Sequence, residues 1–219
     1  MMCESMSADL MNGFDTIEEE YVRELTVKGS RFISILRHCP SQDDIPSIVR
    51  ELTKRFPDAT HYCYAAISDG MGRNERSSDN GEPSGTAGRP ILNVLKGSGL
   101  TDVICVVIRY FGGTLLGTGG LVHTYTESAS SVVSDAVRIR YIQCARFSFT
   151  ADYATYSVFE SRMSRMLFGR PECEYADRVH ATISIRYEDR DEFERRFSEV
   201  TERRIPLSYS GTAFVKERP

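Results

Sequence analysis

Two segments of the chain combine glycine with residues that can bind an anion. The first, 109–121, reads Arg-Tyr-Phe-Gly-Gly-Thr-Leu-Leu-Gly-Thr-Gly-Gly-Leu. An unbroken apolar run, 103–108, precedes it, and a stretch without glycine or proline, 123–141, follows it. This order predicts a buried strand, a glycine-rich loop and a helix whose first N–H groups are unpaired and partly positive. Such a junction can cradle an anion, although its spacing matches neither the Walker A motif nor the dinucleotide fingerprint.

The second segment, 69–90, is a long polar stretch that we predict to be a loop. It combines arginine, carboxylate and hydroxyl side chains: Arg73, Arg76, Arg89, Glu75, Asp79, Glu82, Ser77, Ser78, Ser84 and Thr86. If both segments lie at one end of a sheet, guanidinium and backbone N–H groups would together complement phosphate oxygens. In the alternative, the arginines and the acids pair with each other and order the loop. The spacing leaves both interpretations open.

Other chemistries have weaker support in the same residues. Ser84 does not lie in a Gly-x-Ser-x-Gly elbow, and a nucleophile there would need His61 or His123 beside it. Asp79 and Glu82 could share a divalent metal, or Asp79 could cap a turn. We therefore expect no catalytic residue, no bound metal and no cofactor.

The pattern of apolar residues predicts two α+β domains. In the first, hairpin strands at 21–27 and 31–37 precede a helix at 45–56 and a strand at 61–68. A helix ending near residue 97 follows the long polar segment.

In the second domain, helical spacing over 156–166 and 193–200 alternates with strands beginning at 147, 173, 179 and 207. This βαββαβ order is the ferredoxin-like plan. We place a flexible acidic tail at 1–17, the first domain at 18–140 and the second at 145–219.

Composition excludes several classes of protein. The chain has 219 residues, 41% hydrophobic content and a net charge of −4, which suits a globular protein without a transmembrane helix. Its six cysteines form no Cys-x-x-Cys pair, so a zinc site is poorly supported and a reducing cytoplasm is the natural location. The first 20 residues carry six acids and no Lys or Arg, which leaves the remainder close to neutral.

The glycine-containing segments resemble the signature of the YigZ/IMPACT family (UPF0029). The resemblance rests on Glu-Arg-Ser-Ser-Asp-Asn-Gly-Glu-Pro-Ser-Gly-Thr-Ala-Gly-Arg-Pro-Ile-Leu at 75–92 and on Val-Ile-Arg-Tyr-Phe-Gly-Gly at 107–113 with Leu-Gly-Thr-Gly-Gly-Leu at 116–121. Shorter motifs at 28–32 and 58–65 agree with it. It implies a ribosomal-protein domain-2-like first domain, and a ferredoxin-like second domain similar to the last domain of elongation factor G.

The resemblance also implies a link to translation, because eukaryotic members of the family regulate it. Those members act partly through a separate domain that the resemblance does not cover, so their protein partner is not carried over. This chain departs from the family pattern at Leu115 and His123, where the family usually has a cation. A site that relies on His123 would bind anions better below about pH 6.5.

These observations favour a cytoplasmic, non-enzymatic protein that binds nucleic acid or the ribosome in translation. Its partners would be RNA, the ribosome or a translation-associated protein, and not a membrane. The alternatives are an enzyme for a phosphorylated small molecule or nucleotide, and a protein-interaction module. The residues expected at the anion or nucleic-acid site are Arg76, Ser77, Ser78, Asp79, Glu82, Ser84, Thr86, Arg89, Arg109, Tyr110, Gly112, Gly113, Gly117, Gly119, Gly120 and His123.

Overall fold

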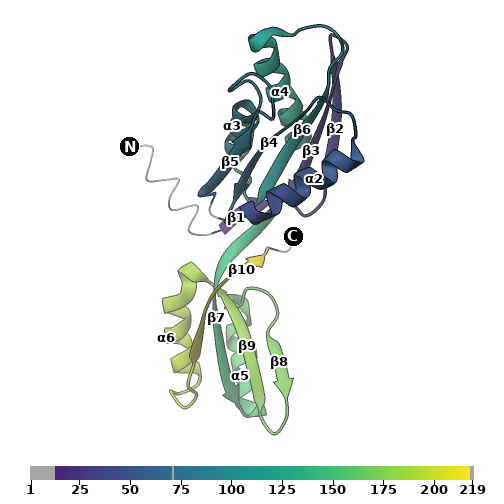
Figure 1. Cartoon of the computed structure of the whole chain (residues 1–219). Helices are drawn as coiled ribbons and strands as arrows, with labels where there is room; N and C mark the ends of the chain where they lie inside the picture. Colours follow the sequence, from purple (N-terminus) through teal and green to yellow (C-terminus); the bar gives the residue numbers. More distant parts are fainter. Residues whose placement is uncertain (1–12, 71, 218–219) are drawn as a thin grey trace, which may run out of the picture. The chain divides into compact units, whose positions relative to one another are not determined.

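A computed structural model describes residues 13–70 and 72–217 of the chain. They form two compact units, one spanning Phe14–Arg140 and the other beginning at Tyr141. The predicted α+β class is confirmed, because each unit packs helices on a mainly antiparallel sheet (Figure 1). Within the described ranges, no helix is long and apolar enough to cross a membrane.

The sheet of the first unit has the strand order β2-β3-β6-β4-β5. Its strands are β2 (Tyr21–Val27), β3 (Ser30–His38), β4 (His61–Ser68), β5 (Asn74–Ser78) and β6 (Val103–Tyr110). The predicted hairpin is present, and positive φ angles at Lys28 and Gly29 make its tight turn. The expected loop at 69–90 is wrong in part, because β5 pairs with β4 inside it and a helix begins at Gly88.

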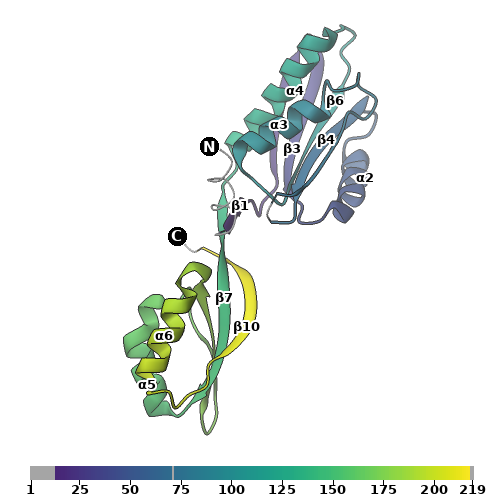
Figure 2. The same cartoon turned by 90° about the vertical axis from the view of Figure 1, so that its left-hand side faces the viewer.

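Three helices cover this sheet on both faces (Figure 2). The helices α3 (Gly88–Ser98) and α4 (Gly117–Ser134) pack on one face, and α2 (Ile45–Arg55) packs on the other. Along β6, residues 103, 105 and 107 belong to the core beneath α3 and α4, whereas 104, 106 and 108 belong to the core beneath α2. Burial on both faces therefore explains the unbroken apolar run, since neighbouring side chains of a strand point to opposite faces.

The second unit has the predicted βαββαβ order. Its elements are β7 (Ile139–Ala151), α5 (Tyr153–Met163), β8 (Glu172–Tyr175), β9 (Val179–Arg186), α6 (Arg190–Val200) and β10 (Ser208–Lys216). Strand β7 pairs with β9 and with β10, and β9 pairs with β8; these three pairings are antiparallel and confirm the ferredoxin-like plan. Both helices cover one face of the sheet (Figure 2). Aromatic and aliphatic side chains from the strands and helices form one core there. That core includes Phe147, Phe149, Tyr156, Phe159, Ile183, Ile185, Phe193 and Phe197.

Short elements complete the described chain. They are β1 (Gly13–Thr16) and the single-turn helices η1 (Gln42–Asp44), η2 (Ser164–Met166) and η3 (Tyr187–Asp189). Residues 1–12 of the expected acidic tail lie outside the described residues. The tail ends earlier than residue 17, because the Asp15 carbonyl accepts a hydrogen bond from the Thr101 N–H at 2.8 Å and Ile17 is fully buried.

Candidate functional site

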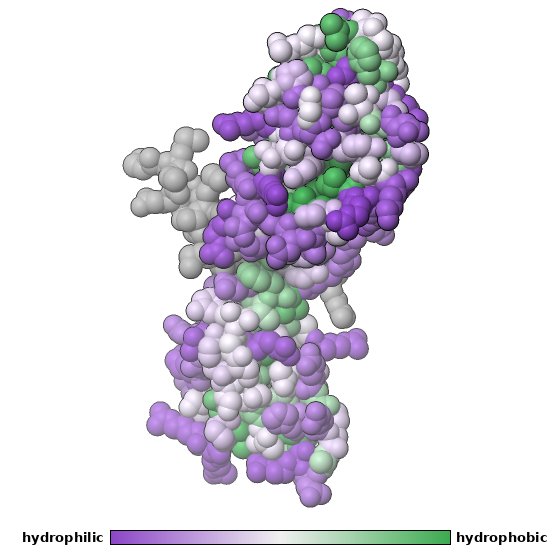
Figure 3. All heavy atoms as spheres, viewed as in Figure 1, coloured by the Kyte–Doolittle hydropathy of each residue, from purple (hydrophilic) through white to green (hydrophobic). Residues whose placement is uncertain are grey.

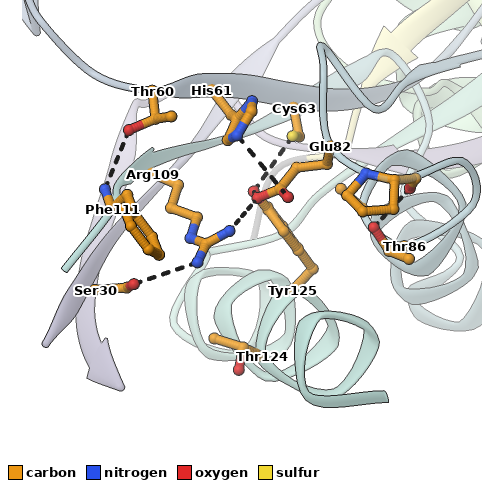
Figure 4. Close-up of polar contacts among 12 residues, drawn as sticks. Ser30, Thr60, His61, Cys63, Glu82, Thr86, Arg109, Phe111, Thr124 and Tyr125 are labelled. Carbon is orange, nitrogen blue, oxygen red and sulfur yellow. Dashed lines mark hydrogen bonds and ion pairs between the residues drawn. The ribbon is translucent and has the colours of Figure 1, made fainter. Parts of the chain in front are cut away.

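A buried ion pair joins the two glycine-containing segments in the first unit. Arg109 donates from Nη1 to Glu82 Oε1 at 2.7 Å, and the two side chains are only 5% and 3% exposed (Figure 4). Tyr125 of α4 donates its hydroxyl to the same carboxylate oxygen at 2.8 Å. Ser30 accepts from Arg109 Nη2 at 3.3 Å. The carboxylate thus holds the strand, the signature segment and α4 together.

Strand periodicity explains why these side chains meet. Arg109 continues the sequence of alternating β6 residues whose side chains face α3 and α4. In the antiparallel ladder Arg109 lies opposite both Phe32 and His61, so those residues share its face. The predicted apolar strand ends two residues later than expected, at Tyr110, and Arg109 is therefore part of the sheet rather than of the loop.

A thiol and an imidazole extend the cluster around Glu82. The Cys63 thiol donates to the Asp79 carbonyl oxygen at 2.9 Å and lies 3.3 Å from the Tyr125 hydroxyl oxygen, and burial raises the pKa of this thiol to about 12. His61 Nδ1 lies 2.9 Å from the Asn80 carbonyl oxygen, while its Nε2 lies 3.9 Å from Glu82 Oε2. Because a carbonyl oxygen only accepts, Nδ1 is the donor of this hydrogen bond.

A cavity of about 420 Å³ opens beside this cluster. His61, Glu82 and Arg109 contribute polar groups to its wall, and the rest of the wall is mostly apolar. Its other lining residues are Thr60, Gly81, Pro83, Phe111, Leu115, Leu116, Gly117, Thr118 and Leu121. Leu115 is 83% exposed, and Figure 3 shows hydrophobic residues gathered over the β6–α4 loop. A largely apolar hollow with a few convergent polar groups is the usual form of a small-ligand site.

Asp79 caps α3 and is not free to act as a ligand. Its carboxylate accepts hydrogen bonds from the N–H groups of Gly85, Ala87 and Gly88 at 2.8, 3.0 and 2.8 Å. Partial burial works to raise the pKa of Asp79, but the three N–H donors outweigh it and lower the pKa below its ordinary value. In the described part of the chain, no group of three His, Cys, Asp or Glu residues is placed to hold a metal ion.

The glycines serve different purposes. Gly112 lies against the backbone of Gly29 and Ser30, so a side chain there would collide with the β2–β3 turn. Gly113 and Gly117 have positive φ angles of 83° and 72°. Gly119 and Gly120 belong to the first turn of α4, which begins earlier than predicted. The glycine-rich loop is therefore shorter than the sequence suggested.

The remaining predicted site residues are spread over the unit. Arg76 lies opposite Ala66, whose partner on β6 is Ile104, about 17 Å along the strand from Arg109. Arg89 is exposed on α3, and the His123 side chain is 82% exposed on α4. The three predicted arginines therefore do not converge on one phosphate.

The hydroxyl groups of the signature segment mostly serve local structure. Thr86 donates to the Pro83 carbonyl at 2.7 Å, and Ser78 accepts from the Asn80 N–H at 3.2 Å. Ser77 and Ser84 are exposed. Tyr110 donates to the Pro57 carbonyl at 3.1 Å.

Sequence reasoning missed Ser30 and Tyr125 as partners of the Glu82–Arg109 pair. Ser30 is 79 positions from Arg109, and Tyr125 is 43 positions from Glu82. Tyr125 itself was the one available signal, because a buried Tyr usually finds a hydrogen-bond partner.

The second unit has a cationic groove on its sheet. A cavity of about 570 Å³ is lined by Arg146, Arg170, Arg186 and Lys216 against Glu172 and Glu217. Arg146 and Ser184 are paired across β7 and β9, so the groove lies on the face that the helices leave open. We name it the sheet groove.

Comparison with known proteins identifies the family. The Impact N-terminal domain model matches residues 28–133, a range that includes every member of the Glu82–Arg109 cluster. IMPACT family member YigZ of Escherichia coli is 33% identical over 64% of this chain and 69% of its own length. The chain belongs to the IMPACT family. IMPACT family member YvyE of Bacillus subtilis is 29% identical over 88% of both chains.

A solved structure also agrees with this IMPACT-family chain over both units. A crystal structure described only as that of a hypothetical protein covers 90% of the chain with a TM-score of 0.62 and 26% identity. The names of these relatives state no activity.

Proposed function

We propose that this IMPACT-family chain is a cytoplasmic, non-enzymatic RNA-binding protein that acts in translation. The observation that carries the proposal is the sheet groove, in which four Arg and Lys residues line one cavity with two Glu residues. The family resemblance supports the link to translation or to the ribosome. The arginine contacts to the phosphates of the strand are thereby assigned to the second unit, because Arg109 in the first unit is already paired with Glu82.

The ion pairs of the groove are weak enough for a phosphate to replace their Glu members. Arg146 Nη2 lies 3.2 Å from Glu172 Oε2, and Arg186 Nη2 lies 2.8 Å from Glu217 Oε1. The two Glu side chains are 77% and 40% exposed, and such pairs contribute about 0–1 kcal/mol. Bidentate binding of a phosphate by an arginine can therefore replace them at little cost.

Two further features favour a single strand as the ligand. Arg170 is exposed, and none of the ion pairs found in the described residues involves it. Phe168 lines the groove beneath the Arg186 guanidinium, which lies 5.0 Å from the ring centroid. Cations that follow a backbone, together with aromatic rings that stack on bases, are typical of sequence-tolerant single-strand binding.

Fluorescence anisotropy with a labelled single-stranded RNA tests the proposal. We expect binding by the full chain at low salt and at least a tenfold weaker affinity after Arg146→Ala combined with Arg170→Ala. Arg162→Ala with Arg165→Ala is the matched control, because these exposed arginines lie at the end of α5 and in η2, outside the groove. Equal losses in both double variants, or no binding at all, would overturn the proposal. Preference for duplex DNA would also contradict it.

A further inference from the structure

We propose that the cavity in the first unit binds one nucleotide, with its base against Phe111 and its phosphate at the start of α4. The ligand chemistry is a flat heterocycle that carries both donors and acceptors and is attached to a phosphate. It can come from a free mononucleotide or from one unit of an RNA strand. Only the second source rests on the function proposed above.

Some polar groups in the cavity wall make fewer hydrogen bonds within the protein than they can. Arg109 is 4% exposed, and its Nε is a buried donor for which the described residues provide no acceptor. Glu82 Oε1 accepts two hydrogen bonds, whereas Oε2 lies 3.9 Å from His61 Nε2. A buried polar atom without a partner is costly, so an unused donor in the same cavity wall as a carboxylate oxygen indicates a ligand that carries both a donor and an acceptor.

The apolar wall fits the faces of such a heterocycle. Phe111 is 45% exposed, and its backbone N–H donates to Thr60 Oγ at 3.1 Å, which fixes the residue at the cavity wall (Figure 4). The Arg109 guanidinium lies 5.5 Å from the Phe111 ring centroid. Leu116 and Leu121 line the cavity as well. An aromatic ring in an apolar hollow stacks on any base, which supplies affinity without sequence preference.

The phosphate position follows from the beginning of α4. This helix has 18 residues, and its N-cap residue, Leu116, offers no side-chain hydrogen bond to the first turn. The first N–H groups of a helix have no partner within it and carry partial positive charge. Gly117 and Thr118 of that turn line the cavity. One hollow therefore presents base-binding and phosphate-binding groups together.

Isothermal titration calorimetry of the full chain with AMP, CMP, GMP and UMP tests the inference, with adenosine and inorganic phosphate as comparisons. We expect a mononucleotide to bind at least tenfold more tightly than adenosine or phosphate. Phe111→Ala should weaken binding about tenfold, and Thr118→Trp should abolish it by filling the cavity. Val122→Trp is the control, because Val122 is exposed on the same helix but does not line the cavity.

A single-stranded oligonucleotide distinguishes the two sources. Binding of mononucleotides that Thr118→Trp removes supports a free nucleotide as the ligand. Binding of the oligonucleotide alone, weakened by Thr118→Trp and not by Val122→Trp, supports a unit of a strand. The inference would be overturned if Thr118→Trp left the affinities for both nucleotides and the oligonucleotide unchanged. Because Arg170→Ala lies in the other unit, it should leave mononucleotide affinity unchanged, so failure of the sheet groove is distinguishable from failure of this cavity.

Discussion

At the scale of single residues, the centre of the first unit is a carboxylate that receives two buried donors. Glu82 is bound by Arg109 and by Tyr125, and the three come from the signature segment, the central strand and α4. Such a pair does not by itself stabilise a fold more than apolar residues would, but removing one partner leaves a buried charge unpaired. The pair therefore fixes the position of the signature segment relative to the sheet.

Glu82→Ala should lower the free energy of unfolding by about 3–5 kcal/mol, because Arg109 then remains charged and buried without its partner. Urea denaturation followed by circular dichroism measures this. Glu75→Ala is the matched control, since Glu75 and its partner Lys96 are 35% and 52% exposed and should contribute less than about 1 kcal/mol. Similar losses in the two variants would show that the buried pair has no special role.

The buried thiols predict a loss of stability in mild alkali. Burial raises the pKa of Cys63 and of Cys105 to about 12, whereas an unfolded thiol ionises near pH 8.5. Their contribution is complete below about pH 8.5 and is lost as the pH rises toward 12, because only the unfolded chain releases the protons. Above about pH 8.5, each buried thiol should lower the free energy of unfolding by about 1.4 kcal/mol per pH unit.

Urea titrations at pH 7.5, 8.5 and 9.5 measure this slope before most tyrosines ionise. Cys105→Ala should lower the slope by the share of one thiol, whatever its effect on stability at pH 7.5. A slope that is unchanged in Cys105→Ala would contradict the assignment.

At the scale of elements, close backbone approach explains more of the site than glycine flexibility does. Gly88 lies against the backbone of Ser78, and a Cβ there would come within 2.8 Å of it. This approach brings the start of α3 to the end of β5, where Asp79 caps the helix. Gly112 likewise allows the β6–α4 loop to touch the β2–β3 turn.

Gly112→Ala should therefore destabilise the protein by roughly 1–3 kcal/mol, the usual cost of overpacking. Gly119→Ala is the control, because nothing lies within 4 Å of a Cβ there and alanine favours the helix by up to about 1 kcal/mol. Thermal unfolding compares the two variants. The explanation fails if both substitutions shift the melting temperature in the same direction.

At the scale of the whole molecule, local patterns predicted the elements well and the site only in part. The strand at 61–68 was predicted at its observed bounds, and alternation in 179–187 identified β9. By contrast, β5 was missed because Asn-Glu-Arg-Ser-Ser has no apolar alternation, and its pairing with β4 alone makes it a strand. The ion pair of Glu82 with Arg109 depends on contacts between distant elements, which no local pattern contains.

The same reason explains why the sheet groove was not predicted. Arg146, Arg170 and Arg186 are scattered along the sequence and become neighbours only through the pairing of β7 with β9 and the loop before β8. The signature segments lie in the first unit, where the structure has a mostly apolar cavity. Each unit thus presents a different kind of surface.

The salt dependence of RNA binding tests the central claim most directly. The logarithm of the affinity for a single strand falls with the logarithm of salt concentration by about 0.7 for each phosphate contact. We predict that Arg170→Ala lowers this slope by about 0.7, whereas Arg162→Ala leaves it unchanged. A slope that is the same in Arg170→Ala as in the unmodified chain would show that the sheet groove does not contact the phosphates.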